Sequence, residues 1–235
     1  VLYAELALLA AQRARSASNF AVSRGFLDSA LAATLSLQAG RPEATSLVLR
    51  IVRQHLANYD AERALRLFTA AETLFAGLPR RSLQYYEFLN LRAELHGYRG
   101  DLAAAAVDLA AMIPMLHDLQ LDPDRRQAMR ADAYTQLIVL EVLRGNDDIA
   151  FGLLRSHPLA DRREEIRARG RFADGTEFWF AVMEEVIHGD GARVGTAGWR
   201  ALLERPVEWH RSVDELQLAD AYARMASSLN RLRRG

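Results

Sequence analysis

The chain has 235 residues, of which half are hydrophobic and only six are proline, so its composition excludes a disordered or collagen-like protein. The 30 basic residues, all of them arginine, balance 30 acidic residues, so no net charge draws the chain to nucleic acid or to an anionic membrane. Cysteine is absent, which excludes disulfides and thiolate metal sites.

The predicted elements are all helices, because Ala, Leu and Arg greatly outnumber β-branched residues. Five of the prolines fall at or between the expected helix ends, as prolines should. In chain order we expect helices at 2–24, 26–39, 42–57, 60–77, 82–99, 101–119, 123–144, 147–156, 174–188, 192–204 and 208–232.

The opening segment "VLYAELALLAAQRARSAS" has the apolar character of a signal-peptide core. Glu5 interrupts that core and no basic segment precedes it, so we interpret the segment as a helix. No run approaches the roughly 18 apolar residues that span a membrane. We expect a cytoplasmic protein, with the periplasm as the alternative. Because the first residue is not Met, we also expect this chain to be part of a longer protein.

Breaks of similar chemistry recur at Gly25, Tyr59, Gly100, Gly145 and Gly189, at spacings of 34, 41, 45 and 44 residues. Glycine ends one helix and a following Asp or Asn can cap the next. This periodicity predicts a single helical repeat domain over 1–235. The expected repeats are about 10–42, 43–79, 82–121, 123–158 and 174–206, followed by a capping helix at 208–232.

Small and bulky residues follow these breaks at fixed offsets of five, nine and twelve positions. A small residue lets two helices of one repeat pack closely. The triplets are Ala30, Thr34 and Leu37; Ala64, Phe68 and Ala71; Ala105, Leu109 and Met112; and Ala150, Leu154 and His157. This pattern resembles the tetratricopeptide repeat (TPR), in the expanded form that is found in bacterial regulatory and adaptor proteins.

The resemblance implies an all-α, right-handed superhelix of stacked helix–turn–helix repeats, with a concave groove that is lined by the first helix of each repeat. It implies a groove with a basic N-terminal part, an acidic middle and an apolar C-terminal part. The predicted partner-binding residues are Arg15, Asn19, Arg53, Glu87, Asn90, Glu94, Tyr98, Thr135, Val139, Leu143, Trp179 and Met183. The C-terminal helix at 208–232 could instead fill this region as a cap.

We therefore predict a scaffold or adaptor that binds a protein or peptide partner. The alternative is a ligand-sensing or autoinhibitory domain of a bacterial signalling or transcriptional regulator, whose effector module lies outside these residues. The connector at 159–174 is the best internal candidate for a hinge, as an exposed loop or an extra helical turn. The sequence leaves the oligomeric state open.

An enzyme, a cofactor and a bound metal are not expected. Glu185 and His188 have the spacing that helical di-metal proteins use, but no second Glu-x-x-His lies on a helix. The arginine-rich run at 161–171 contains its own acidic residues, which predicts a self-paired, solvated surface and no direct contact with nucleic acid.

Overall fold

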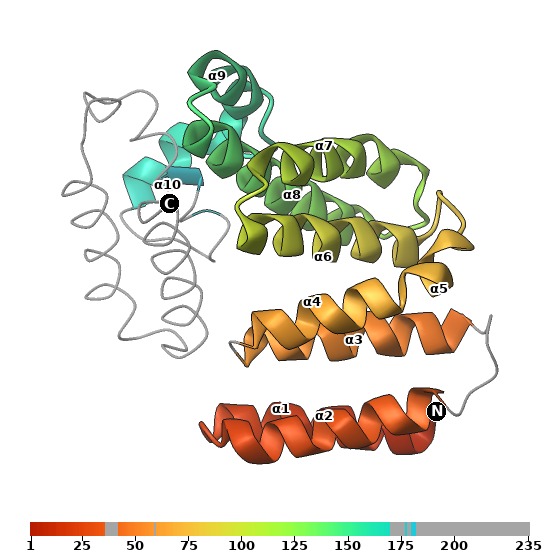
Figure 1. Ribbon diagram of the computed structural model, residues 1–235. Coiled ribbons are helices and arrows are strands. Elements are labelled where there is room, and N and C mark those ends of the chain that lie inside the picture. Colours follow the sequence, from red (N-terminus) through yellow and green to blue (C-terminus); the bar gives the residue numbers. More distant parts are fainter. Residues whose placement is uncertain (36–41, 59, 170–176, 178–179, 182–235) are drawn as a thin grey trace. The chain divides into compact units, whose positions relative to one another are not determined.

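The computed structural model describes residues 1–35, 42–58, 60–169, 177, 180 and 181, and every regular element among them is a helix (Figure 1). Successive helices form antiparallel pairs, so the predicted all-α architecture of helix–turn–helix repeats is confirmed. The contacts divide the chain into two compact units, Val1–Leu95 and His96–Gly235.

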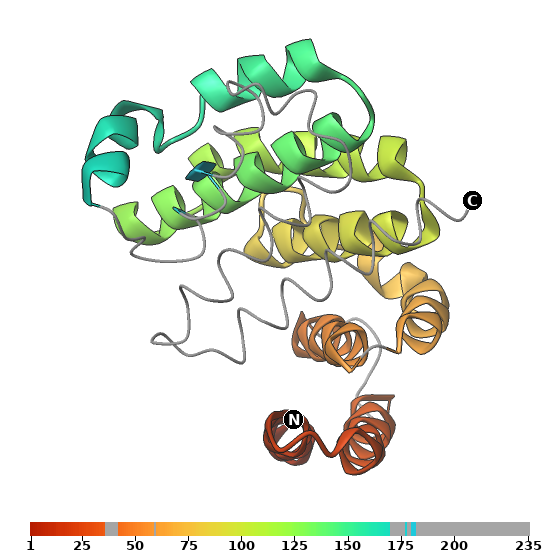
Figure 2. The same cartoon turned by 90° about the vertical axis from the view of Figure 1, so that its left-hand side faces the viewer.

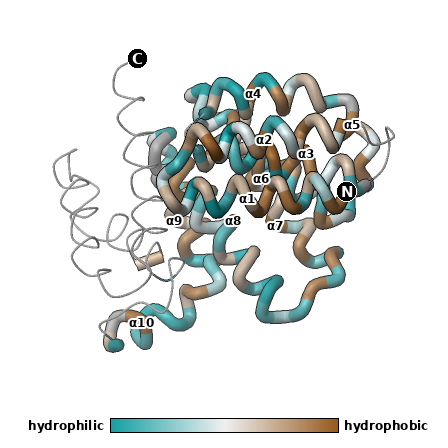
Figure 3. The backbone as a smooth tube through the Cα atoms, turned by 90° about the horizontal axis from the view of Figure 1, so that it is seen from below, coloured by the Kyte–Doolittle hydropathy of each residue, from teal (hydrophilic) through white to brown (hydrophobic). Residues whose placement is uncertain are grey.

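The first unit is built from helices that pack on their sequence neighbours. Along these helices hydrophobic and hydrophilic segments alternate (Figure 3), as expected where one side of each helix is buried. Figure 2 looks nearly along the first four helices and shows the third lying next to both of the first two, in agreement with the contacts. The helices are α1 (Leu2–Ser16), α2 (Phe20–Leu35), α3 (Pro42–Ala57), α4 (Ala61–Ala70), α5 (Glu72–Ala76) and α6 (Leu83–Arg99), whose last turn crosses into the second unit.

Four turns between paired helices share one hydrogen-bond pattern. The backbone N–H of Asn19 donates to the Ala14 carbonyl at 2.8 Å, and the same bond over five residues recurs at 60, 101 and 146 at 2.9, 3.0 and 2.9 Å. This bond marks a Schellman turn, in which the residue before the donor takes a left-handed conformation. Ser18, Gly100 and Gly145 have positive φ angles of 57°, 79° and 75°. Local chemistry thus ends each of these helices in the same way.

The predicted first turn at Gly25 is wrong. Gly25 lies inside α2, and the chain turns seven residues earlier, at Ser18. The Asn19 side chain accepts a bond from the Val22 N–H at 3.2 Å and so caps α2. A glycine inside a helix costs about 1 kcal/mol relative to alanine, which the packing of α2 offsets. The helices predicted at 2–24 and 26–39 are replaced by α1 and α2.

The described small and bulky positions after the turns are buried as predicted, and Leu37 lies outside the described residues. Ala30, Ala64, Ala105 and Ala150 are all completely buried. Counted from Ser18, the first triplet becomes Ser23, Leu27 and Ala30, each of them also completely buried. In α2, α4 and α9 a fixed offset after the turn therefore places the buried side against the preceding helix. Here the close packing of small residues, and not helix propensity alone, explains the alanines.

Ser23 stands where the other repeats have alanine, and its hydroxyl joins three helices. Ser23 Oγ of α2 donates to the Ala11 carbonyl of α1 at 2.8 Å. Asn58 Nδ2, just after α3, donates to Ser23 Oγ at 2.9 Å. Because a buried hydroxyl is costly unless it is hydrogen-bonded, these two bonds fix α1, α2 and the end of α3 together.

An aromatic cluster fills the unit between α4, α5 and α6. The rings of Phe68 and Phe88 stack at 5.5 Å, and Phe75 lies 5.1 Å from Phe68 and 5.0 Å from Phe88. Tyr85 stacks on Phe88 at 5.7 Å. The helix predicted over 60–77 is divided at Ala71 into α4 and α5, and this break lets Phe68 and Phe75 both face Phe88.

The second unit continues the same scheme, with α7 (Leu102–Asp118) packed on α8 (Pro123–Leu143) and α8 packed on α9 (Asp147–Arg155). The connector predicted at 159–174 is helical over most of its described length, and a buried carboxylate holds it: Glu177 pairs with Arg169 at 2.6 Å and with Arg162 at 3.3 Å. The 3-10 turn η1 (Ala160–Arg162) and α10 (Arg163–Arg169) follow α9. The helices predicted at 192–204 and 208–232, and most of 174–188, lie outside the described residues.

Candidate partner-binding surface

The first helices of the first two repeats, α1 and α3, lie side by side and run in the same direction. Glu5 of α1 and Arg50 of α3 bridge them through a bidentate ion pair, with both carboxylate oxygens 2.6 Å from Nη1. We call the exposed side of this pair the α1–α3 surface. It comprises Leu2, Glu5, Leu6, Leu9, Gln12, Glu43, Ser46, Arg50, Arg53 and Gln54.

Two open hollows lie on the α1–α3 surface, one toward each end of the helices. The larger, of about 320 Å³, is lined by Glu5, Leu6, Leu8, Leu9, Gln12, Arg50, Arg53 and Gln54. The smaller, of about 280 Å³, is lined by Val1, Glu5, Glu43, Ser46, Leu47 and Gln84. A mixture of apolar walls and a few polar groups is typical of sites that bind other molecules.

The charges on this surface are unevenly distributed. Glu5 and Arg50 neutralise each other near the middle. Arg53 in the larger hollow and Glu43 in the smaller hollow are exposed, and neither takes part in the ion pairs found among the described residues. The surface therefore presents a free cation toward one end and a free anion toward the other.

The predicted groove residues of the first repeat lie elsewhere than expected, because their positions were counted from Gly25. Arg15 is half-buried near the end of α1, and Asn19 caps α2. Counting from Ser18 moves these two positions to Leu8, which is buried, and to Gln12, which lines the larger hollow. Arg53 lines the same hollow.

The acidic middle of the predicted groove lies on α6. Glu87, Asn90 and Glu94 are half-buried at spacings of three and four residues, which places them along one side of the helix. Tyr98 is also half-buried on α6, but it belongs to the second unit. The structure therefore keeps these three polar positions together on one face.

The apolar part of the predicted groove is only partly described. Val139 is half-buried on α8. The side chain of Leu143, and all of Trp179 and Met183, lie outside the described residues.

Thr135 is buried, and it bonds within the unit. Its Oγ1 lies 3.0 Å from Nε2 of His157, which also lies 3.1 Å from the Ala131 carbonyl. Nδ1 of His157 accepts the Leu159 N–H at 3.1 Å, so the proton of the neutral ring resides on Nε2. Thr135 holds this histidine and is not available to a partner.

Two buried histidines have altered acidity. Burial lowers the pKa of His157 to about 4, with a further contribution from Arg130 that the bond to the Ala131 carbonyl opposes. Burial also lowers the pKa of His55, aided by Arg63 and opposed by Asp60. Both rings are therefore neutral at pH 7 and belong to the interior of their units.

Sequence reasoning missed most of the α1–α3 surface. Leu2, Leu6 and Leu9 were placed on a helix without a role, although their spacing of four and three residues puts them on one side. Arg50 also lacked a role, because its partner Glu5 lies 45 residues away in the sequence. The leucine spacing was a usable signal, whereas the ion pair required the packing of α1 on α3.

Among the described residues, no group of three or more His, Asp or Glu side chains could hold a metal ion. None of the helices in those residues has the length and the apolar character needed to cross a membrane.

No protein-family model and no curated protein matches the sequence. Among solved structures the chain is similar to the TPR-like repeats of a protein assigned as a kinesin light chain from Podosopora anserina, with 16% identity and a TM-score of 0.61. That match covers 88% of this chain and 97% of the other. A point variant of those repeats matches with a TM-score of 0.62 and 16% identity, over 87% of this chain and 94% of the other. The fold is therefore a TPR-like helical repeat fold.

Proposed function

We propose that this protein is a non-catalytic scaffold or adaptor that binds a protein or peptide on the first-helix side of its repeats. The observation that carries the proposal is the pair of hollows on the α1–α3 surface, where apolar walls meet exposed charged and amide side chains. Second-helix positions such as Ala64 and Ala105 are buried by packing within the repeats. The charged and amide side chains of the α1–α3 surface stay accessible to a partner. A preformed surface of this kind loses little conformational entropy when a partner binds.

The alternative, a ligand-sensing domain, is less well supported by this geometry. A small ligand is normally held in a pocket that buries most of its surface. Both hollows open to solvent along the helices, which suits a peptide chain better than a small molecule. A cytoplasmic location, expected because Glu5 interrupts the apolar opening segment, remains part of the proposal, and a role in bacterial signalling belongs to the alternative that the resemblance implied.

The test is selection from a phage-displayed library of random peptides, followed by anisotropy measurements with the selected peptides. We expect micromolar binders whose affinity falls about tenfold or more in Gln12→Trp, because the indole fills the larger hollow. The matched control is Gln120→Trp, an exposed glutamine in the second unit, which should bind as the unaltered protein does.

Equal affinity of the Gln12→Trp and Gln120→Trp proteins would contradict the proposed site. Failure to select any peptide would contradict the scaffold function itself.

A further inference from the structure

One side of α1 carries three exposed leucines. Leu2, Leu6 and Leu9 are 74%, 56% and 47% exposed, and their spacing aligns them over two helical turns, about 10 Å. The opposite side of the helix is packed against its neighbours through Ala4, Ala7, Leu8 and Ala11. Single exposed apolar residues are common on protein surfaces, but an aligned stripe marks a contact site.

Charges of opposite sign lie toward the two ends of this leucine stripe. The smaller hollow joins Val1 of α1 to Glu43 of α3, and the larger hollow joins Gln12 of α1 to Arg53. Glu43 therefore lies beside the start of the stripe and Arg53 beside its end, about 15 Å apart along α3. The Glu5–Arg50 pair between them is already neutralised.

This arrangement is complementary to itself. Consider a two-fold axis that lies in the plane of the α1–α3 surface and crosses both helices near Leu6. A second copy then faces the first with its helices antiparallel, as an isologous dimer requires. Leu9 meets the partner's Leu2, Leu6 meets the partner's Leu6, and Arg53 meets the partner's Glu43. A partner with charge of one sign would instead place a like charge against either Glu43 or Arg53.

We propose that the α1–α3 surface is a self-association site at which a second copy of this chain packs its leucine stripe antiparallel against the first. The contact is small compared with a standard interface of about 800 Å² per partner, so the dimer is weak and has a Kd in the micromolar range, about 1–100 µM. The inference goes beyond the proposed function, and a partner at the same surface has to displace the second copy.

The first experiment is analytical ultracentrifugation of the full chain at about 1–200 µM, a range set by the expected Kd. We expect a monomer–dimer equilibrium in the unaltered protein. Leu6→Glu should be monomeric throughout, because the dimer would bring two carboxylates together among leucines. Val107→Glu, at a 69% exposed valine on α7, is the matched control and should dimerise normally. A monomer at every concentration, or a dimer that Leu6→Glu leaves intact, overturns the proposal.

A charge exchange tests the antiparallel geometry and uses no core substitution. Arg53→Glu and Glu43→Arg each place like charges together at both ends of the dimer and should weaken it about tenfold or more. The double variant exchanges the signs and should restore the Kd to within about threefold. A double variant no tighter than either single variant overturns the proposed pairing. Neither experiment involves a peptide, so these results leave the proposed function to its own test.

Discussion

At the scale of single residues, the most informative side chains are buried polar groups, because each requires a partner inside the protein. Ser23 accepts a bond from Asn58 Nδ2 and donates one to the Ala11 carbonyl, and these two bonds tie α1, α2 and the end of α3 together. His157 bonds through both ring nitrogens and stacks on Phe180 at a centroid distance of 4.7 Å. Each of these polar residues identifies a specific contact inside its unit, whereas alanines are too frequent along the chain to do so.

His157 gives a prediction about acid stability. Its pKa is about 4 in the folded chain and near 6.5 when unfolded, so the unfolded chain binds a proton more readily between these values. Its contribution is complete above pH 6.5 and is lost as the pH falls toward 4. We expect this residue to remove about 2 kcal/mol of unfolding free energy between pH 7 and pH 5.

Urea unfolding at the two pH values, for the unaltered protein and for His157→Gln, measures this loss. The variant should show a fall that is smaller by about the same 2 kcal/mol. An NMR titration should place the His157 midpoint near pH 4. A midpoint close to 6.5, or equal falls in both proteins, would contradict the burial that lowers the pKa.

At the scale of elements, the turns decide where each helix ends. Gly100 ends α6 with a φ of +79°, a conformation that other residues adopt at a cost. Gly25 lies inside α2, with no atom within 4 Å of the position that a Cβ would take. The same residue type therefore has opposite roles at these two places.

Alanine substitutions test these two roles. Gly100→Ala should lower the unfolding free energy by about 1–2 kcal/mol, because it forces a Cβ into a left-handed conformation. Gly25→Ala should raise it by about 0.5–1 kcal/mol, because alanine is the better helix former and finds open space. Urea denaturation measures both. If Gly25→Ala lowers the unfolding free energy, that result would contradict the helical position of Gly25 and would indicate a turn at residue 25.

The misplaced turn explains why much of the fold was still predicted correctly. A shift of seven residues rotates a helix by nearly two full turns, so the same side of α2 stays buried. Ala30 was thus identified as a packing residue from the wrong turn, and Ser23 joins it from the right one. A glycine in the sequence suggests a turn, so Gly25 was chosen. Nothing in the sequence indicates that Ser18 adopts the left-handed conformation that the turn requires.

The binding surface was less predictable than the fold for a related reason. Asn19, counted from Gly25, was assigned to the middle of a first helix but lies beyond the end of α1. Thr135 was assigned to the groove because its offset matched, but a buried histidine 22 residues away captures its hydroxyl. The local turn at Ser18 decides where Asn19 lies, whereas a contact between residues distant in sequence decides the role of Thr135, and local periodicity carries no information about that contact.

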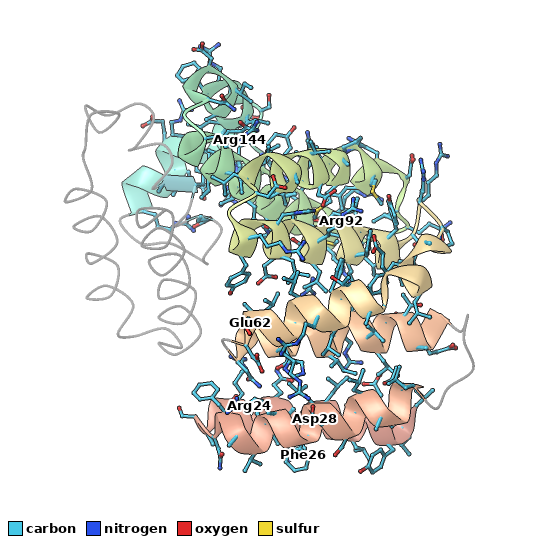
Figure 4. All side chains as sticks on the ribbon, viewed as in Figure 1. Arg24, Phe26, Asp28, Glu62, Arg92 and Arg144 are labelled. Atoms are coloured by element: carbon cyan, nitrogen blue, oxygen red, sulfur yellow. The ribbon has the colours of Figure 1, made fainter. Side chains whose placement is uncertain are left out.

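At the scale of the whole molecule, the chain divides into two compact units that repeat one packing rule. Residues that face away from the neighbouring helices stay exposed even when they are apolar. Phe26, at 39% exposure, lies on the side of α2 that points away from α3 and α4 (Figure 4). The equivalent alanines Ala64 and Ala105, one in each unit, are completely buried. In a repeat protein the stability is approximately a sum of terms from each repeat and from neighbouring interfaces.

This additivity predicts that damage stays local. Ala64→Leu and Ala105→Leu each insert three extra carbon atoms at a close helix contact and should cost about 1–3 kcal/mol. Hydrogen exchange should then accelerate mainly within 1–95 for Ala64→Leu and mainly from residue 96 onward for Ala105→Leu. Ala103→Leu, at an exposed position of the same helix as Ala105, is the control and should leave exchange unchanged. Faster hydrogen exchange along the whole chain in either variant would mean that the two units unfold as one cooperative body. Unchanged hydrogen exchange in both variants would mean that these alanines do not set the helix spacing.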